Sequence, residues 1–198
     1  MSHNYPLNVS FKILAMAPQM SITDASGSLV YYVKQKMLKL KEAVTVFGDQ
    51  AQTQPLYKIS ADRIIDFSAR YNFADAAGTP LGGVKRQGMQ SLWKARYDIF
   101  QGDEQSPALT ISEENVAVRL ADGCLNQIPI VGLFAGYFLN PSYLVARPDG
   151  TGVMRISKQP ALFEGKFKID RLVELDEFEE KRILLSLIMM TLLERVRG

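Results

Sequence analysis

The end of the chain, from Asp176 to Gly198, constrains the fold most, because an apolar run occupies its middle. We interpret this stretch as one helix, in which Asp176 and Glu179 form a capping box and further acidic residues suit the positive helix terminus. Between Ile183 and Leu193, apolar side chains fall on every face of such a helix. A helix with this pattern in a soluble protein must be enclosed on all sides.

The apolar run is too short to cross a membrane, which takes roughly 20 consecutive apolar residues. Ser186 and Thr191 interrupt the run, and Arg182 and Glu194 flank it. We therefore expect this helix to form the core of a soluble domain.

The composition is compatible with a single domain over residues 1–198. Hydrophobic residues make up 47% of the chain, which is enough for a sizeable core. The 23 Lys and Arg residues nearly balance the 21 Asp and Glu residues, so a dedicated nucleic-acid-binding protein is not expected. Cys124 is the only cysteine, which excludes an internal disulfide framework and favours a reducing, cytoplasmic compartment. The N-terminal region has no basic segment before its short apolar run, so we expect no export signal.

Between Val9 and Ile111 the sequence repeats one unit, a turn between two extended segments. The extended segments are rich in aromatic and β-branched residues, as β-strands are. A fifth turn at Asp149 and a last strand region from Phe163 to Leu175 complete the pattern. The repeats predict β-hairpins that are added to a sheet in regular order. In the first four turns the aspartates recur at intervals of 25 to 28 residues, at Asp24, Asp49, Asp75 and Asp103.

A hairpin series of this length has two exposed edges, which promote aggregation unless they are paired. Closure into a barrel removes both edges, and a barrel of about a dozen strands is wide enough to hold one helix. The predicted fold is therefore mainly β. It is a closed antiparallel barrel of about twelve strands that encloses the hydrophobic helix, which we place at residues 177–197.

The interval between the fourth and fifth turns is longer than the others by roughly twenty residues, which indicates an insert. We predict an amphipathic helix from Ser112 to Gln127, with Ser112 as its cap and Glu113 and Glu114 in its first turn. Cys124 lies on the apolar stripe of this helix and is interpreted as an ordinary core residue. Residues 113–139 thus form a helical and hydrophobic insert in the barrel domain.

Taken together, the repeated hairpins with Ile22-Thr23-Asp24-Ala25-Ser26-Gly27, the strand, turn and strand from Tyr143 to Ile156, and the final hydrophobic helix resemble the tubby-like superfamily. The chain is most similar to its LURP-one-related branch, which is itself similar to the phospholipid scramblases. The resemblance implies a twelve-stranded barrel around a central C-terminal helix. The insert departs from the minimal pattern. The Pro-rich arm, cysteine cluster and acidic calcium-binding segment of the scramblases are not evident.

The sequence offers little for catalysis. His3 is the only histidine, in an N-terminal segment that we expect to be disordered, so neither a Ser-His-Asp nor a Cys-His arrangement is available. The Asp and Glu residues lie mostly in turns or at helix starts, where capping explains them. The Gly82-Gly83 pair is better interpreted as a strand irregularity than as a phosphate-binding loop. We expect no catalytic residues, no metal site and no cofactor.

The lysine-rich segment from Lys34 to Lys41 is the first candidate binding surface. Its charged positions change parity after Met37, so a bulge there would allow all four lysines to face solvent. Tubby domains bind phosphoinositides, and the resemblance therefore implies an anionic phospholipid headgroup as the ligand. The alternative is that these are ordinary solvated lysines that discourage edge pairing. The candidate residues are Lys34, Lys36, Lys39 and Lys41, with Lys85 and Arg86 from a later repeat.

The second candidate lies in residues 128–146, a stretch without a formal charge. Prolines and glycines break any helix there, so we expect no transmembrane span. The stretch is either a hydrophobic lid on the barrel or an exposed patch around Phe134 and Phe138. Such a patch would insert into a bilayer or dock a partner.

The leading functional hypothesis is a non-enzymatic binding or scaffolding module at an anionic phospholipid surface, a peripheral membrane contact in the cytoplasm. One alternative is a protein-interaction or regulatory barrel with no lipid role, and another is a scramblase-like lipid mover. The location of the two candidate segments discriminates between the first two hypotheses, because lysines on the same side as Phe134 and Phe138 would favour a membrane.

Overall fold

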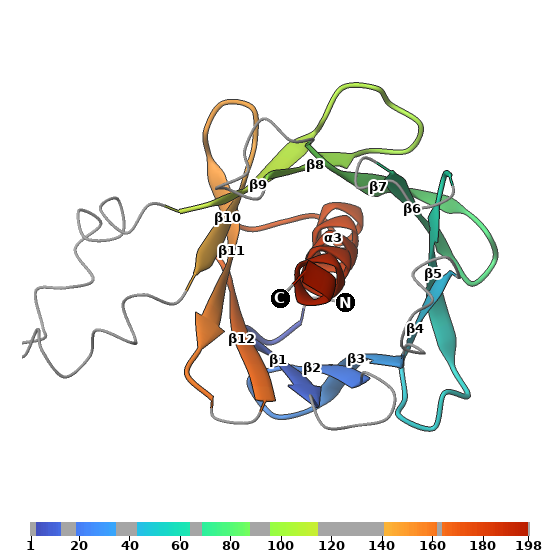
Figure 1. The fold of residues 1–198 in the computed structure, drawn as a ribbon, viewed down its shortest axis with the longest axis vertical. Coiled ribbons are helices and arrows are strands. Elements are labelled where there is room, and N and C mark those ends of the chain that lie inside the picture. Colours follow the sequence, from blue (N-terminus) through green and yellow to red (C-terminus); the bar gives the residue numbers. More distant parts are fainter. Residues whose placement is uncertain are drawn as a thin grey trace, which may run out of the picture.

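The computed structural model describes residues 3–12, 19–34, 43–63, 69–87, 96–114, 141–161 and 164–197. These residues form a closed antiparallel barrel of twelve strands around one helix, α3 (Glu177–Arg197), as Figure 1 shows. The predicted mainly β barrel with an enclosed helix is therefore confirmed. The strands are β1 (Leu7–Lys12), β2 (Gln19–Thr23), β3 (Leu29–Lys34), β4 (Val44–Phe47), β5 (Pro55–Ala61), β6 (Arg70–Asp75), β7 (Pro80–Arg86), β8 (Arg96–Phe100), β9 (Leu109–Glu113), β10 (Ser142–Ala146), β11 (Gly152–Gln159) and β12 (Glu164–Arg171).

Closure of the barrel depends on one long-range pairing. Each strand pairs with the next in the sequence, and β1 returns to pair with β12, from Leu7 opposite Ile169 to Lys12 opposite Glu164. Because both ends of the series are paired in this way, the sheet has no free edge.

The aspartates of the turns act as predicted. In the β2–β3 turn, Oδ1 of Asp24 accepts the backbone N–H groups of Ser26 and Ser28, both at 2.9 Å. In the β6–β7 turn, Asp75 does the same with Ala77 at 2.9 Å and Thr79 at 2.8 Å. These bonds satisfy backbone donors that the tight turns leave without sheet partners.

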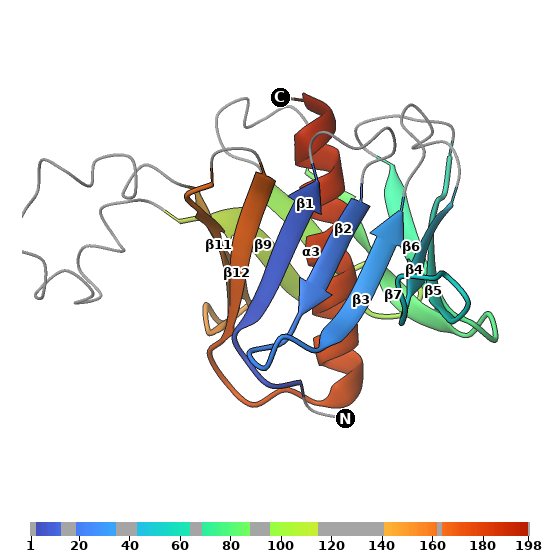
Figure 2. The same ribbon diagram turned by 90° about the horizontal axis from the view of Figure 1, so that it is seen from below.

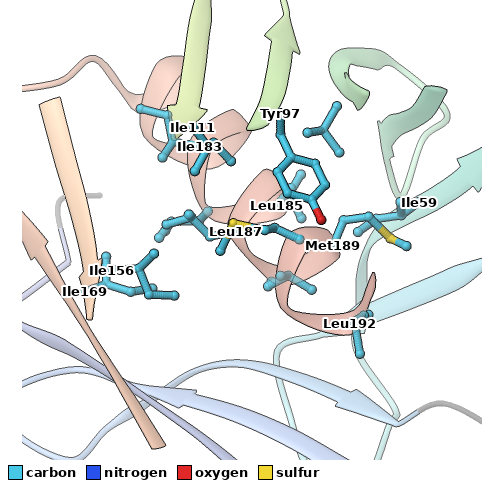
Figure 3. Close-up of a cluster of buried hydrophobic side chains, with 14 of the residues drawn as sticks. Ile59, Tyr97, Ile111, Ile156, Ile169, Ile183, Leu185, Leu187, Met189 and Leu192 are labelled. Carbon is cyan, nitrogen blue, oxygen red and sulfur yellow. The ribbon is translucent and has the colours of Figure 1, made fainter. Parts of the chain in front are cut away.

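α3 begins at the predicted cap, since Oδ1 of Asp176 accepts the N–H groups of Phe178 and Glu179 at 2.9 Å each. From there the helix passes through the middle of the barrel (Figures 1 and 2). The Ser186 hydroxyl donates to the Arg182 carbonyl and the Thr191 hydroxyl to the Leu187 carbonyl, so neither polar side chain needs a partner from the wall. Figure 3 shows strand residues packed around this helix, including Ile59, Tyr97, Ile111, Ile156 and Ile169.

Gly82 of β7 allows α3 to approach the wall. α3 lies nearest to β6, β7 and β8. At Gly82 the backbone has φ +131°, and an added Cβ would overlap the Phe100 carbonyl and lie 3.1 Å from Cδ of Arg182. Arg182 uses the space to donate to the Leu81 carbonyl at 3.0 Å. The register also shifts between Phe73 and Ala74 on β6, so the predicted strand irregularity is present.

The structure corrects two predictions. Ser112 and Glu113 belong to β9, opposite Leu144 and Tyr143 of β10, and do not begin a helix. Glu114 extends the sheet, because its N–H donates to the Ser142 carbonyl at 2.8 Å. The rest of the predicted insert, including Cys124, lies outside the described residues.

The second correction concerns the N-terminal segment, which is ordered from His3. The ring of His3 packs edge-on against Tyr31, with the ring centroids 5.9 Å apart, and the Asn4 carbonyl accepts the N–H of Ala25. Tertiary contacts thus order a segment whose sequence shows no regular pattern.

Candidate functional site

Because neighbouring strands are antiparallel, the connections between them lie alternately at the two ends of the barrel. The tight turns, from β2–β3 to β10–β11, lie at the end where α3 begins, which we call the turn end. α3 finishes at the opposite end, as Figure 2 shows. We call that end the basic end, because Lys34, Arg96 and Lys158 are exposed at or next to strand ends there, beside an exposed Arg63–Asp62 pair.

The turn end is acidic, and its interior is closed by specific contacts. The Tyr5 hydroxyl donates to Oε1 of Glu180 at 2.7 Å, and Arg147 pairs with Glu179 at 2.9 Å. The carboxyl groups at this end come from the turns and the start of α3: Asp24, Asp49, Asp75, Asp103, Glu104, Asp149, Glu174, Asp176, Glu177 and Glu179. An anionic surface would be repelled by this end of the molecule.

The structure separates the sequence-predicted site residues that it describes. Lys34 is exposed at the end of β3. Lys85 and Arg86 are consecutive on β7, so they point to opposite faces of the wall. Lys85 lies opposite Asp98 of β8 on the outer face, whereas Arg86 faces the interior beside Tyr97. Outside the described residues lie Lys36, Lys39, Lys41, Phe134 and Phe138.

Arg86 belongs to a cluster that links the wall to the last turns of α3. Its Nη2 lies 3.7 Å from Oε1 of Glu194, and the two side chains are 13% and 31% exposed. The Tyr97 hydroxyl donates to the same Oε1, and the Arg86 guanidinium lies 5.9 Å from the centre of the Tyr97 ring. Glu194 is therefore shared between a phenol from β8 and a guanidinium from β7.

Tyr143 and Glu113 extend this cluster along the wall. They lie directly opposite each other on β10 and β9, with Glu113 in line with the buried Ile111 on the inner face. Burial, followed by the nearby carboxylates Glu194 and Glu113, raises the pKa of Tyr143 to about 12. Burial and its hydrogen bond to Glu194 raise the pKa of Tyr97 as well. Both phenols are therefore protonated at neutral pH, and the Tyr97 hydroxyl is the one that donates to Glu194.

The described part of the chain holds no cluster of three or more His, Cys, Asp or Glu side chains that would suit a metal ion. No helix of the described residues combines the length and the apolarity that crossing a membrane requires. The Arg86–Glu194 pair and the exposed Lys34 make the basic end the candidate binding site.

Sequence reasoning identified Arg86 but missed the residues around it. The sequence placed Tyr97 and Tyr143 in predicted strands and Glu113 in the predicted insert. It placed Glu194 at the end of the apolar run, with no further role. One signal was available, because Glu194 is an acidic residue on a helix that has to be enclosed. A buried carboxylate requires a partner. Which partner it finds depends on the register of strands about a hundred residues away.

Comparison with known proteins gives one match. Residues 29–171, well over half of the chain, match the family model described as LURP-one-related. No curated protein and no solved structure matches the chain.

Proposed function

The chain belongs to the LURP-one-related family, and we propose that it is a non-enzymatic binding or scaffolding module that docks its basic end on an anionic phospholipid surface. Such a surface is found on the cytoplasmic leaflet of membranes, which attracts basic segments. The proposed contact is peripheral and reversible.

The observation that carries this proposal is the placement of the strand ends. The lysine-rich segment begins at Lys34, the last residue of β3, and is followed by β4 from Val44. Glu113 and Ser142 are the strand ends on either side of the segment that contains Phe134 and Phe138. All four flanking strand ends lie at the basic end, because alternate connections of an antiparallel barrel share one end. The strand ends that flank the two candidate segments therefore lie at one end of the barrel, which supports a membrane contact at that end.

The distribution of charge supports the same orientation. Lys34, Arg96 and Lys158 are exposed at the basic end, whereas the opposite end carries the acidic turns. An anionic surface attracts the first end and repels the second, so the molecule is expected to bind with α3 along the membrane normal. Each exposed lysine or arginine near such a surface contributes about 1 kcal/mol.

The proposal is tested by co-sedimentation with neutral and anionic vesicles. Wild type is expected to pellet with anionic vesicles only. Salt should weaken binding steeply, because the Debye length falls from about 10 Å at 0.1 M to about 3 Å at 1 M. The variant with Lys34, Lys36, Lys39 and Lys41 changed to Glu should stay in the supernatant.

A matched pair of double variants controls for total charge. Lys34→Glu with Lys36→Glu is compared with Lys58→Glu and Lys168→Glu, whose side chains lie within the strands of the wall. Only the first pair should lose binding. Equal pelleting with both lipids, or no pelleting of wild type, would contradict the membrane proposal.

One observation favours the protein-interaction alternative. Phe178 is 64% exposed and Leu172 is 41% exposed, the large hydrophobic residues that stand out on the described surface. Phe178 lies in the first turn of α3 at the turn end, away from the proposed lipid contact. If vesicle binding fails, this end is the next surface to examine for a partner protein.

A further inference from the structure

The geometry points to Arg86 as a phosphate-binding residue at the basic end, with Glu194 as an internal counter-ion that competes with the phosphate. This inference rests on the proposed function and adds to it the chemistry of the ligand, the phosphate group of an anionic phospholipid. It also assigns to Glu194 the role of restraining that binding.

Arg86 differs from the arginines that hold the fold together. Arg147 makes three hydrogen bonds to Glu179, and Arg155 makes three to Glu114. Within the described part of the chain, no hydrogen bond of the Arg86 guanidinium is found, and its closest approach to Glu194 is 3.7 Å. A charge-assisted N–H···O bond is about 2.7 to 2.9 Å long, so this pair attracts without bonding directly.

The guanidinium is suited to a phosphate for two reasons. Its planar fork of N–H donors matches two phosphate oxygens at once, whereas an ammonium acts as a single charge. Arg86 is also the last residue of β7, at the terminus of the strand and on its inner face. A headgroup that reaches the end of the barrel therefore meets donors that no other hydrogen bond of the described residues occupies.

Tyr97 allows Glu194 to release Arg86 at low cost. The Tyr97 hydroxyl donates to Oε1 of Glu194, and this bond can persist when Arg86 turns toward a phosphate. The carboxylate, whose side chain is 31% exposed, then keeps one hydrogen-bond donor while its other side faces solvent. Tyr143 lies within electrostatic reach of both charges, because, besides burial, Glu194 raises and Arg86 lowers the pKa of its phenol.

The test is a cycle of four proteins: wild type, Glu194→Gln, Arg86→Gln and the double variant. Vesicle affinity is measured with neutral and anionic lipid. Glu194→Gln should tighten binding to anionic vesicles about fivefold, which corresponds to one positive charge near the surface. Arg86→Gln should weaken binding by a similar factor. In the Arg86→Gln background, Glu194→Gln should no longer tighten binding, because the two residues act through one contact.

Glu113→Gln is the matched control, because it removes a carboxylate from the inner face of the same end, on β9. A smaller effect than that of Glu194→Gln is expected. Equal tightening by both changes, or tightening by Glu194→Gln that survives in the Arg86→Gln background, would reduce the effect to general electrostatics and overturn the assignment. Arg86→Lys keeps the charge but not the fork, and it should bind anionic vesicles more weakly than wild type.

A second readout is the Nε–Hε signal of Arg86 in NMR spectra, recorded with inorganic phosphate and with anionic vesicles. Saturable shifts with phosphate alone identify free phosphate as a sufficient ligand, and shifts with vesicles alone identify the lipid headgroup. If wild type binds anionic vesicles but the Arg86 signal stays unchanged, the assignment fails while the proposed function stands. If neither ligand binds, both fail.

Discussion

The Tyr5 hydroxyl lies 2.7 Å from Oε1 of Glu180, a hydrogen bond that joins residues 175 positions apart in the chain. Glu180 is on α3 and only 3% exposed. The Arg171 guanidinium lies 5.0 Å from the centre of the Tyr5 ring. The N-terminal segment thereby satisfies a buried carboxylate at the turn end and fastens α3 to the barrel.

Tyr5→Phe should lower the free energy of unfolding by about 1 to 3 kcal/mol, because it leaves a buried acceptor without its donor. Urea unfolding followed by circular dichroism measures the loss. Tyr143→Phe is the control and should change stability less, since the Tyr143 hydroxyl has no hydrogen-bond partner among the described residues. An equal loss of unfolding free energy in the two variants would show that the Tyr5–Glu180 hydrogen bond does not stabilise the fold specifically.

Leu187→Ala should cost about 2 to 5 kcal/mol, since it opens a cavity between α3 and the wall, and Leu187→Asp should prevent folding. Leu187 is 1% exposed, whereas Leu172 is 41% exposed and provides the same substitution at the surface. Leu172→Ala should change the free energy of unfolding by about 0.5 kcal/mol or less. A Leu187→Ala protein as stable as the Leu172→Ala control would be incompatible with an enclosed helix.

Gly82→Ala should be among the most damaging substitutions in β7. Its φ of +131° strains any other residue, and the new Cβ would overlap the Phe100 carbonyl. Gly78→Ala separates the two effects, because Gly78 has φ +88° but no atom within 4 Å of the added Cβ. The Gly78 variant should lose about 1 to 2 kcal/mol from backbone strain alone. In thermal unfolding, the Gly82→Ala protein should have a clearly lower melting temperature than the Gly78→Ala protein.

The protein should unfold in alkali between about pH 10 and pH 12. Tyr143 has a pKa of about 12 in the folded protein against 10.0 ordinarily, so its folded-state pKa is raised. This contribution to stability is complete below pH 10 and is lost as the pH rises toward 12, because only the unfolded chain then releases the proton. Tyrosine absorbance near 295 nm and circular dichroism should therefore change together. Early, non-cooperative ionisation of all tyrosines would contradict the burial of Tyr143 and Tyr97.

The closed barrel and its central helix were predictable because their signals are local. An aspartate such as Asp75 bonds to N–H groups two and four residues away, so its turn is recognisable wherever it lies in the fold. The all-round apolarity of residues 183–193 requires an enclosure, and repeated hairpins provide one. The pair Gly82-Gly83 also predicted an irregular strand, because consecutive glycines are a local signal in the sequence.

The candidate site and the limits of β9 were decided by tertiary structure. The local pattern of Ser112, Glu113 and Glu114 is typical of a helix start. Pairing with β10 instead extends the strand through Ser112 and Glu113. A shift of one position turns a side chain to the other face of a strand, so the sequence alone did not distinguish the inward Arg86 from the outward Lys85. Arg86 meets Glu194 because the barrel closes around α3 in one register. Neighbouring residues encode turns and helices, whereas contacts between distant residues depend on the closure of the whole sheet.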